Sequence, residues 1–352
     1  VTVLDPAEQT IAVLGHPGYI FDQTEKTVQA QQKLTFYTDR HIVRTGLEVI
    51  SANHRLLGGG NVNGNYTVKL DQAQLDALRS RNPGAGLGIS DIPANVEVLN
   101  YNVELRPQAF GARQTVFSAY VEDAFSLNSR LLLTLGLRYD YDNLSKGGGS
   151  EGDYNNLAPR FSFNYKLNSH SALRGGYGIF YDKILYAVYS DALQQNTTSA
   201  DYRKQLQALI DKGILPANTD LDKITFEGNL TASLSGVPYL GGPSFSELQA
   251  RRDQAFSNER RILNPDGYQN PYTHQFSLGY QNQLDELRLF YVDLMHNKSF
   301  NLFRLRDLNA PAPYPLNDPG NATARPGAEA DLTRPVPIEN NSATINGELL
   351  PG

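Results

Sequence analysis

The sequence predicts an all-β protein, a transmembrane antiparallel up-and-down β-barrel that is incomplete in this chain, with about 9–10 strands of a larger barrel. Three observations predict this fold. Apolar and polar side chains alternate with a period of two, the alternating segments are unusually long, and short turns alternate with long loops. Because successive side chains of a strand point to opposite faces, a period of two indicates sheet and excludes helix.

The alternation is clearest in Arg130–Asp142. One face carries only leucine and tyrosine, and the other is polar apart from Leu132: Leu131, Leu133, Leu135, Leu137, Tyr139 and Tyr141 oppose Thr134, Gly136, Arg138 and Asp140. Arg113–Asn128, Leu157–Leu167 and Ser171–Asp182 are the expected neighbouring strands. All are longer than the usual ~5–6 residues. A strand of about 11 residues tilted by roughly 40° spans ~25 Å, the height of a bilayer's apolar band.

Further strands and a few helices are expected along the chain. The strands are Gln9–Leu14, Thr27–Tyr37, His41–Asn53, Asn95–Arg106, Pro271–Leu284 and Leu287–Asn297, and the helices are Asp71–Ser80, Ser199–Lys212 and Ser244–Phe256. In Asn95–Arg106, simple alternation places Val96 and Val98 on the face opposite Tyr101 and Val103. The whole chain, 1–352, is therefore expected to be one partial barrel with long loops at about 54–94, 143–156, 183–270 and 306–352. Tight turns at one end and long loops at the other are typical of outer-membrane barrels.

Composition narrows the function classes. The chain has 352 residues, 40% of them hydrophobic, a mean hydropathy of −0.42 and a net charge of −6. No run of 18 apolar residues is present, so a transmembrane helix is excluded, whereas a barrel is allowed because half of each strand is polar. The absence of cysteine excludes disulfide frameworks and thiol nucleophiles. The negative charge argues against a nucleic-acid partner.

No sequence motif indicates an enzyme, a bound cofactor or a metal site. The glycines at Gly175, Gly176 and Gly178 are not followed by the helix that a phosphate loop needs. The six histidines show no ligand spacing, and no nucleophile elbow is present. We therefore expect a protein without catalytic residues.

Six motifs carry a resemblance to a known family. Val116–Asp123 and Leu133–Asp140 resemble the barrel of TonB-dependent outer-membrane receptors. Four others look like the Oar-like branch in particular: Asn155–Arg160, Leu173–Asp182, Asn270–Tyr272 and Asp307–Pro311. The resemblance covers roughly residues 41–311, apart from the loop interiors.

The resemblance implies a location, a mechanism and partners. Receptors of this family are barrels of about 22 strands, plugged by an N-terminal domain, in the outer membrane of Gram-negative bacteria. They import a large or scarce ligand, such as a siderophore, a carbohydrate or a peptide, by coupling to the TonB complex. The implied partners are therefore outer-membrane lipid, the plug domain of the same protein, the TonB complex and a ligand. Since neither a plug nor a TonB box is recognisable, we expect the chain to be a fragment of such a receptor.

Two groups of residues are candidates for the site. Arg138, Arg160, Arg174, Glu122 and Asp140 fall on polar faces of successive strands and predict a charge network in the lumen that holds the plug or guides a ligand. Ordinary charge pairing on a hydrated wall is the alternative. In the loop 183–270, Tyr186, Tyr189, Tyr202 and Tyr239 are candidates for ligand contact, and a packed lid is the alternative.

Two other functions fit the same pattern. One is a passive or adhesive surface barrel that does not use TonB. The other is a soluble all-β binding domain or enzyme, because a soluble sandwich also alternates.

Overall fold

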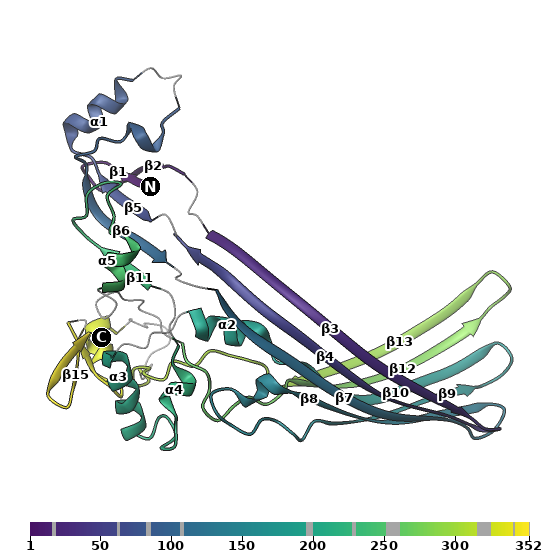
Figure 1. Cartoon of the computed structure of the whole chain (residues 1–352). Coiled ribbons are helices and arrows are strands. Elements are labelled where there is room, and N and C mark those ends of the chain that lie inside the picture. Colours follow the sequence, from purple (N-terminus) through teal and green to yellow (C-terminus); the bar gives the residue numbers. More distant parts are fainter. Residues whose placement is uncertain are drawn as a thin grey trace.

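The structure is a computed structural model that describes residues 1–15, 19–61, 64–81, 86–105, 109–194, 200–226, 230–250, 261–314, 325–340 and 342–351. Its main feature is one curved antiparallel sheet of eight long strands, in which neighbours in the sheet follow one another along the chain. We call this sheet the wall (Figure 1). Its strands are β3 (Tyr19–Tyr37), β4 (His41–Gly60), β7 (Phe110–Ser126), β8 (Leu131–Asp142), β9 (Leu157–Lys166), β10 (Ser171–Tyr181), β12 (Tyr272–Gln283) and β13 (Leu289–Phe300). This up-and-down order confirms the predicted fold class.

The four short turns all lie at one end of the wall (Figure 1). Each is closed by a polar side chain at its start. Asn128 Oδ1 accepts hydrogen bonds from the backbone N–H groups of Arg130 and Leu131, and Asn168 and Asp285 do the same in their turns. In the first turn, Thr38 Oγ1 accepts from the N–H of His41. Such side chains replace the backbone partners that a turn lacks, which explains why these short connections are tight.

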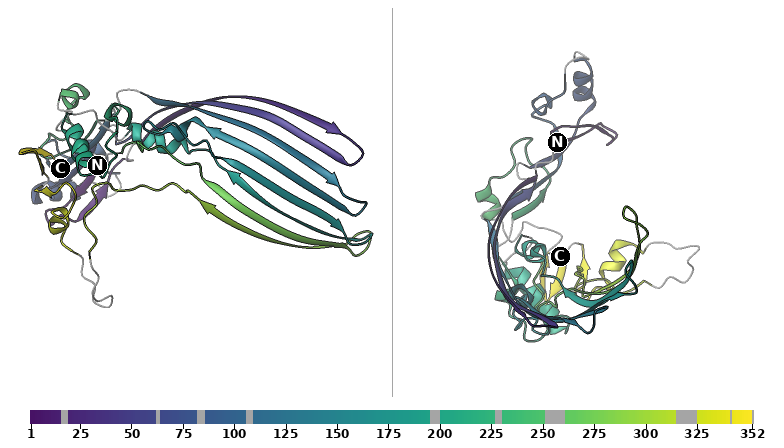
Figure 2. Two further views of the ribbon diagram at one scale, coloured as in Figure 1. Left: turned by 90° about the horizontal axis from the view of Figure 1, so that it is seen from below. Right: turned by 90° about the vertical axis from the view of Figure 1, so that its right-hand side faces the viewer.

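The wall is curved into an open trough (Figure 2). On the apolar face, large side chains lie side by side across neighbouring strands. The register pairs Leu135 with Phe161, Phe161 with Tyr177, and Tyr177 with Phe276. The polar face lies on the hollow side of the trough. Gln114 belongs to this face, and its side chain donates a hydrogen bond to the carbonyl of Ile184, at the start of the loop 183–270 on the hollow side. We call the two sides the outer and inner faces.

A second, smaller sheet stands at the loop end of the wall. It contains β11 (Leu230–Leu234), β6 (Glu97–Leu105), β5 (Asn65–Lys69), β1 (Thr2–Leu4) and β2 (Thr10–Val13), in that order. It packs with α1 (Gln72–Arg79) and α5 (Phe245–Ala250) around a core that includes Val68, Leu75 and Tyr239. Two of the ten expected strands, Gln9–Leu14 and Asn95–Arg106, belong to this sheet as β2 and β6. The wall therefore has eight of the expected strands, and part of the expected loop 54–94 is strand, because β4 extends to Gly60 and β5 pairs with β6.

A β-bulge in β6 corrects the face expected for that strand. Thr67 pairs with Asn100 whereas Val68 pairs with Val98, so Leu99 is an extra residue on β6. The bulge shifts the alternation by one position. As a result Val98 and Tyr101, which simple alternation separates, are both buried in the same core.

The remaining segments form a cap on the inner side of the loop end. It contains η2 (Asn143–Lys146), α2 (Tyr186–Gln194), α3 (Ala200–Asp211), α4 (Leu221–Ile224), α6 (Gly327–Asp331), and a sheet of β14 (Ile338–Glu339), β15 (Ser342–Ile345) and β16 (Glu348–Pro351). A second core joins them, with Leu206 and Leu209 of α3 packed with Ile345 and Leu350. The cap thus includes the tail that was expected to be loop.

The three expected helices are present as α1, α3 and α5 where the structure describes them, whereas α2, α4 and α6 were not expected. α1 begins with a capping box in which Asp71 accepts from the N–H of Gln74 and the Gln74 side chain accepts from that of Asp71. α3 ends before Gly213, which has a φ of 70° and therefore suits glycine. Ser199 and residues 251–256 of the expected helices lie outside the described residues. No described helix is both long enough and apolar enough to cross a membrane.

Candidate functional site: the inner face of the wall and its cap

A cluster of ion pairs lies on the inner face of β4, β7 and β8. Arg138 binds Asp140 with its Nε, at 2.9 and 3.0 Å from the two carboxylate oxygens, and its Nη2 lies 3.5 Å from Glu48. Arg44 and Glu122, directly opposite one another on β4 and β7, are 2.8 Å apart. All these side chains are partly exposed, so each pair stabilises the wall only weakly.

The structure brings some of the predicted network together and separates the rest. Arg138, Asp140 and Glu122 lie in this cluster with Arg160 beside them, whereas Arg174 lies nearer the turns and pairs with Asp293 of β13. The paired residues fit the alternative of ordinary charge pairing on the wall, and a role in holding a plug or guiding a ligand stays a prediction.

Sequence reasoning missed three charged partners in the ion pairs described above: Arg44, Glu48 and Asp293. The first two stand on the polar positions of an expected strand, so its alternation could have identified them. Asp293 is different, because its partner is two strands away and only the sheet register shows the pairing.

A buried carboxylate anchors the cap to the wall. Asp142, at the end of β8, is 1% exposed and accepts hydrogen bonds from the N–H groups of Leu144 and Ile184 and from Gln114 Nε2. The same Gln114 nitrogen donates to the carbonyl of Ile184. The start of the loop 183–270 is therefore fixed to two wall strands at once.

Three of the resemblance motifs, Asn155–Arg160, Leu173–Asp182 and Asn270–Tyr272, meet in a second buried cluster, which holds the other end of that loop. Asn156 is fully buried, and its Nδ2 donates to the Asp153 carbonyl at 3.1 Å and to Asn270 Oδ1 at 3.3 Å. Asn270 in turn donates its backbone N–H to the Asp153 carboxylate and its side-chain amide to the Asp182 carbonyl. Asn156 and Asn270 thereby fix where β9, β10 and β12 meet the cap.

The four tyrosines predicted for ligand contact lie within the packed parts of the loops. Tyr189 and Tyr202 are 9% and 6% exposed in the cap core, and Tyr239 is 8% exposed in the core of the second sheet. Tyr186 stacks on His54 of β4 with ring centroids 4.1 Å apart. Burial raises the pKa of Tyr186, Tyr189 and Tyr239 above the ordinary value of tyrosine. These positions fit the packed-lid alternative, and contact of these tyrosines with a ligand stays a prediction.

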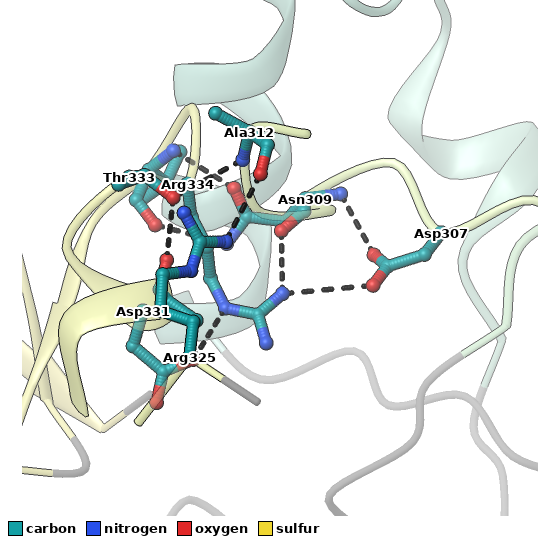
Figure 3. Close-up of polar contacts among 9 residues, drawn as sticks. Asp307, Asn309, Ala312, Arg325, Asp331, Thr333 and Arg334 are labelled. Carbon is teal, nitrogen blue, oxygen red and sulfur yellow. Dashed lines mark hydrogen bonds and ion pairs between the residues drawn. The ribbon is translucent and has the colours of Figure 1, made fainter. Parts of the chain in front are cut away.

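Arg334 ties the tail of the chain into the cap (Figure 3). Its Nε donates to Asp331 at 2.7 Å, its Nη1 donates to the Asn309 carbonyl at 2.7 Å, and the same atom lies 3.6 Å from Asp307. The Asn309 side chain exchanges two hydrogen bonds with the backbone of Val336, which is buried in the cap core. The Asp307–Pro311 motif is therefore the point at which the chain leaving β13 joins the cap.

These features define a protein class. The strands are long and antiparallel, with an apolar outer face and a polar inner face. Tight turns lie at one end and a folded cap at the other, and this combination is typical of an outer-membrane β-barrel. The chain belongs to the family described as outer membrane beta barrel domain, whose model matches residues 8–148 and 142–348. The protein is accordingly located in the outer membrane. Family membership excludes the soluble all-β alternative.

Several solved structures are similar to the chain at low identity. The outer membrane transporter YddB from Escherichia coli is 14% identical with a TM-score of 0.39, over 76% of this chain and 24% of that one. The siderophore receptor PirA from Acinetobacter baumannii is 14% identical with a TM-score of 0.36, over 85% and 30%. The copper transporter OprC is 12% identical with a TM-score of 0.36, over 79% and 31%. The chain thus spans less than a third of each of these proteins. No curated protein matches the sequence.

Proposed function

We propose that the chain is part of the barrel of an outer-membrane receptor of the TonB-dependent kind, from the Oar-like branch, that imports a large or scarce ligand. In this proposal the wall is scaffold, the cap faces the cell exterior, and a TonB complex supplies the energy through a plug domain. The protein acts as a transporter and not as an enzyme. The ligand class is a siderophore, a carbohydrate or a peptide.

The difference between the two ends of the wall is the observation that carries the proposal. At one end four turns are closed by single side chains, and at the other the loops fold into two cores, of which the cap core is fixed to the strands by Asp142 and Asn270. A passive pore does not need folded loops of this size. A receptor that selects a scarce ligand needs an outer surface of defined shape. The six resemblance motifs support the same family.

Binding of TonB to the full-length protein tests the proposal. The full-length protein, extracted from membranes in mild detergent, is applied to immobilised periplasmic C-terminal domain of TonB from the same bacterium. We expect specific retention that is lost when the first residues of the mature receptor, which would contain the TonB box, are deleted. Equal retention of the truncated protein and of an unrelated porin would contradict TonB coupling.

A conductance measurement separates the proposal from the passive alternative. A plugged receptor in a planar lipid bilayer is expected to give little steady current, whereas a passive barrel conducts ions continuously. Steady, plug-independent current together with no TonB retention would establish the alternative.

A further inference from the structure

One arginine on the inner face differs from the other three. Arg44, Arg138 and Arg174 each have a carboxylate partner within 3 Å. Arg160 of β9 forms no ion pair at contact distance with a described residue, although Asp140 and Glu122 act on it electrostatically from farther away, and its Nε is buried without a hydrogen bond. A guanidinium group is always charged, and leaving its N–H donors without hydrogen-bond acceptors costs free energy. This side chain is therefore a candidate for an external anion.

The sheet leaves Arg160 standing between two glycines. Gly136 of β8 and Gly178 of β10 are its direct neighbours across the strands, so neither side has a side chain that covers it. An added Cβ at Gly178 would lie 3.0 Å from the Phe180 ring and 3.3 Å from Arg160 Cγ, so only glycine leaves this contact undisturbed. The two positions directly opposite Arg160 therefore carry no side chain, and the Phe180 ring lies against its guanidinium group.

Phe180 fixes the direction of the guanidinium group. The Arg160 Cζ atom lies 4.4 Å from the centroid of the Phe180 ring, which is cation–π distance. Stacking occupies the face of the planar guanidinium group and, since Nε is buried, leaves the two terminal Nη groups for a bidentate acceptor. A carboxylate is the acceptor that matches this geometry.

We propose that Arg160 binds a carboxylate group of the solute that moves through the barrel. This inference rests on the proposed function, because it requires that a solute passes along the inner face. Glu122 and Asp140 are held nearby by Arg44 and Arg138, and their negative charges weaken the binding of a further anion. Weak binding suits transit, because a solute that is held too tightly does not leave.

Arginine modification of the full-length protein tests the proposal, with citrate as the probe. The purified protein in detergent is treated with p-hydroxyphenylglyoxal, which reacts with accessible guanidinium groups, and the adducts are located by peptide mass spectrometry. We expect Arg160 to react about tenfold faster than Arg138, whose donors are engaged by carboxylates. Citrate is expected to slow the reaction at Arg160 severalfold and to leave the rate at Arg138 unchanged.

Two glycine variants make the test specific. Gly178→Ala displaces the ring and the arginine, so protection of Arg160 by citrate should be lost. Gly136→Ala is the matched control, because its added Cβ would meet nothing closer than 3.6 Å, and protection should remain. Retained protection in Gly178→Ala would contradict the role of the Phe180 stack.

Two results would overturn the proposal. If Arg160 reacts no faster than Arg138, a carboxylate of the same protein already occupies it. If it reacts fast but citrate does not slow it, the group binds no carboxylate. Neither result depends on TonB binding, so failure here is distinct from failure of the proposed function.

Discussion

Arg174 of β10 and Asp293 of β13 form an ion pair that passes over Gly279 of the intervening strand β12. Arg174 Nη2 lies 3.0 and 2.9 Å from the two Asp293 oxygens, and Arg174 Nε lies 3.3 Å from Oδ1. Gly279 is the direct neighbour of both residues in the register. A Cβ at this position would occupy the space of the Asp293 carboxylate. The glycine is thus required by a contact between its two neighbouring strands.

The first prediction concerns this glycine. Gly279→Ala should displace the ion pair and lower the temperature at which the full-length protein in detergent loses its heat-modifiable gel mobility. Because both partners are exposed, the loss of the pair alone contributes about 1 kcal/mol or less, so Asp293→Ala should have a small effect. In the double variant Gly279→Ala/Asp293→Ala the clash with the carboxylate is gone, and most of the loss should be restored. A double variant as unstable as Gly279→Ala would show that the glycine is needed for backbone reasons instead.

The second prediction concerns the anchor of the cap. Asp142→Asn keeps the shape of the side chain but replaces one acceptor oxygen by an amide that cannot accept from Ile184, Leu144 and Gln114 together. Hydrogen bonds to charged groups contribute about 1.5–3 kcal/mol each, so the loop start should detach more often. Limited proteolysis of intact cells should then cleave within 183–270 severalfold faster. Asp293→Asn, on the wall far from the cap, is the control and should leave the cleavage rate unchanged.

Alkaline pH should loosen the cap, through Tyr189 and Tyr268. Burial raises the pKa of both phenols above the ordinary value in the folded cap. Between the unfolded pKa of about 10 and the higher folded pKa, only the unfolded loops ionise, so stability is full below pH ~10 and falls as the pH rises. Proteolysis of the cap should therefore accelerate above pH ~10. Tyr189→Phe removes one of the ionising groups and should reduce this acceleration. The variant also loses the hydrogen bond to the Leu144 carbonyl, which lowers the stability of the cap by about 1 kcal/mol.

Much of the wall is predictable because its signal is local. Alternation together with the short turns predicts all eight strands of the wall, and residues such as Asn128 and Asp285 mark the turns through side-chain bonds two or three residues away. The extra length of β4 is not visible in this way, because Leu56 and the glycines after it do not alternate with polar residues.

What the sequence could not reveal depends on distant partners. One extra residue at Leu99 reverses the faces of β6, and nothing local marks the bulge. The second sheet brings together segments as far apart as Val3 and Tyr239, which no periodicity relates. In the site, the unpaired state of Arg160 follows from Gly136 and Gly178 standing beside it, and that depends on the register of three strands.

The facing of the wall toward lipid is the central claim, and β8 is the strand on which to measure it. Leu135→Arg would be a poor test, because Asp123 lies directly opposite Leu135 and would pair with the new charge. This chain contains no cysteine, so single cysteines at Leu133, Thr134, Leu135 and Leu137 can carry a fluorescent label in a full-length protein in which any cysteines outside this chain are replaced by serine. Quenching by a lipid-soluble quencher in reconstituted bilayers should be strong at the three leucine positions and weak at Thr134. Equal quenching at all four positions, or stronger quenching at Thr134, would contradict the account.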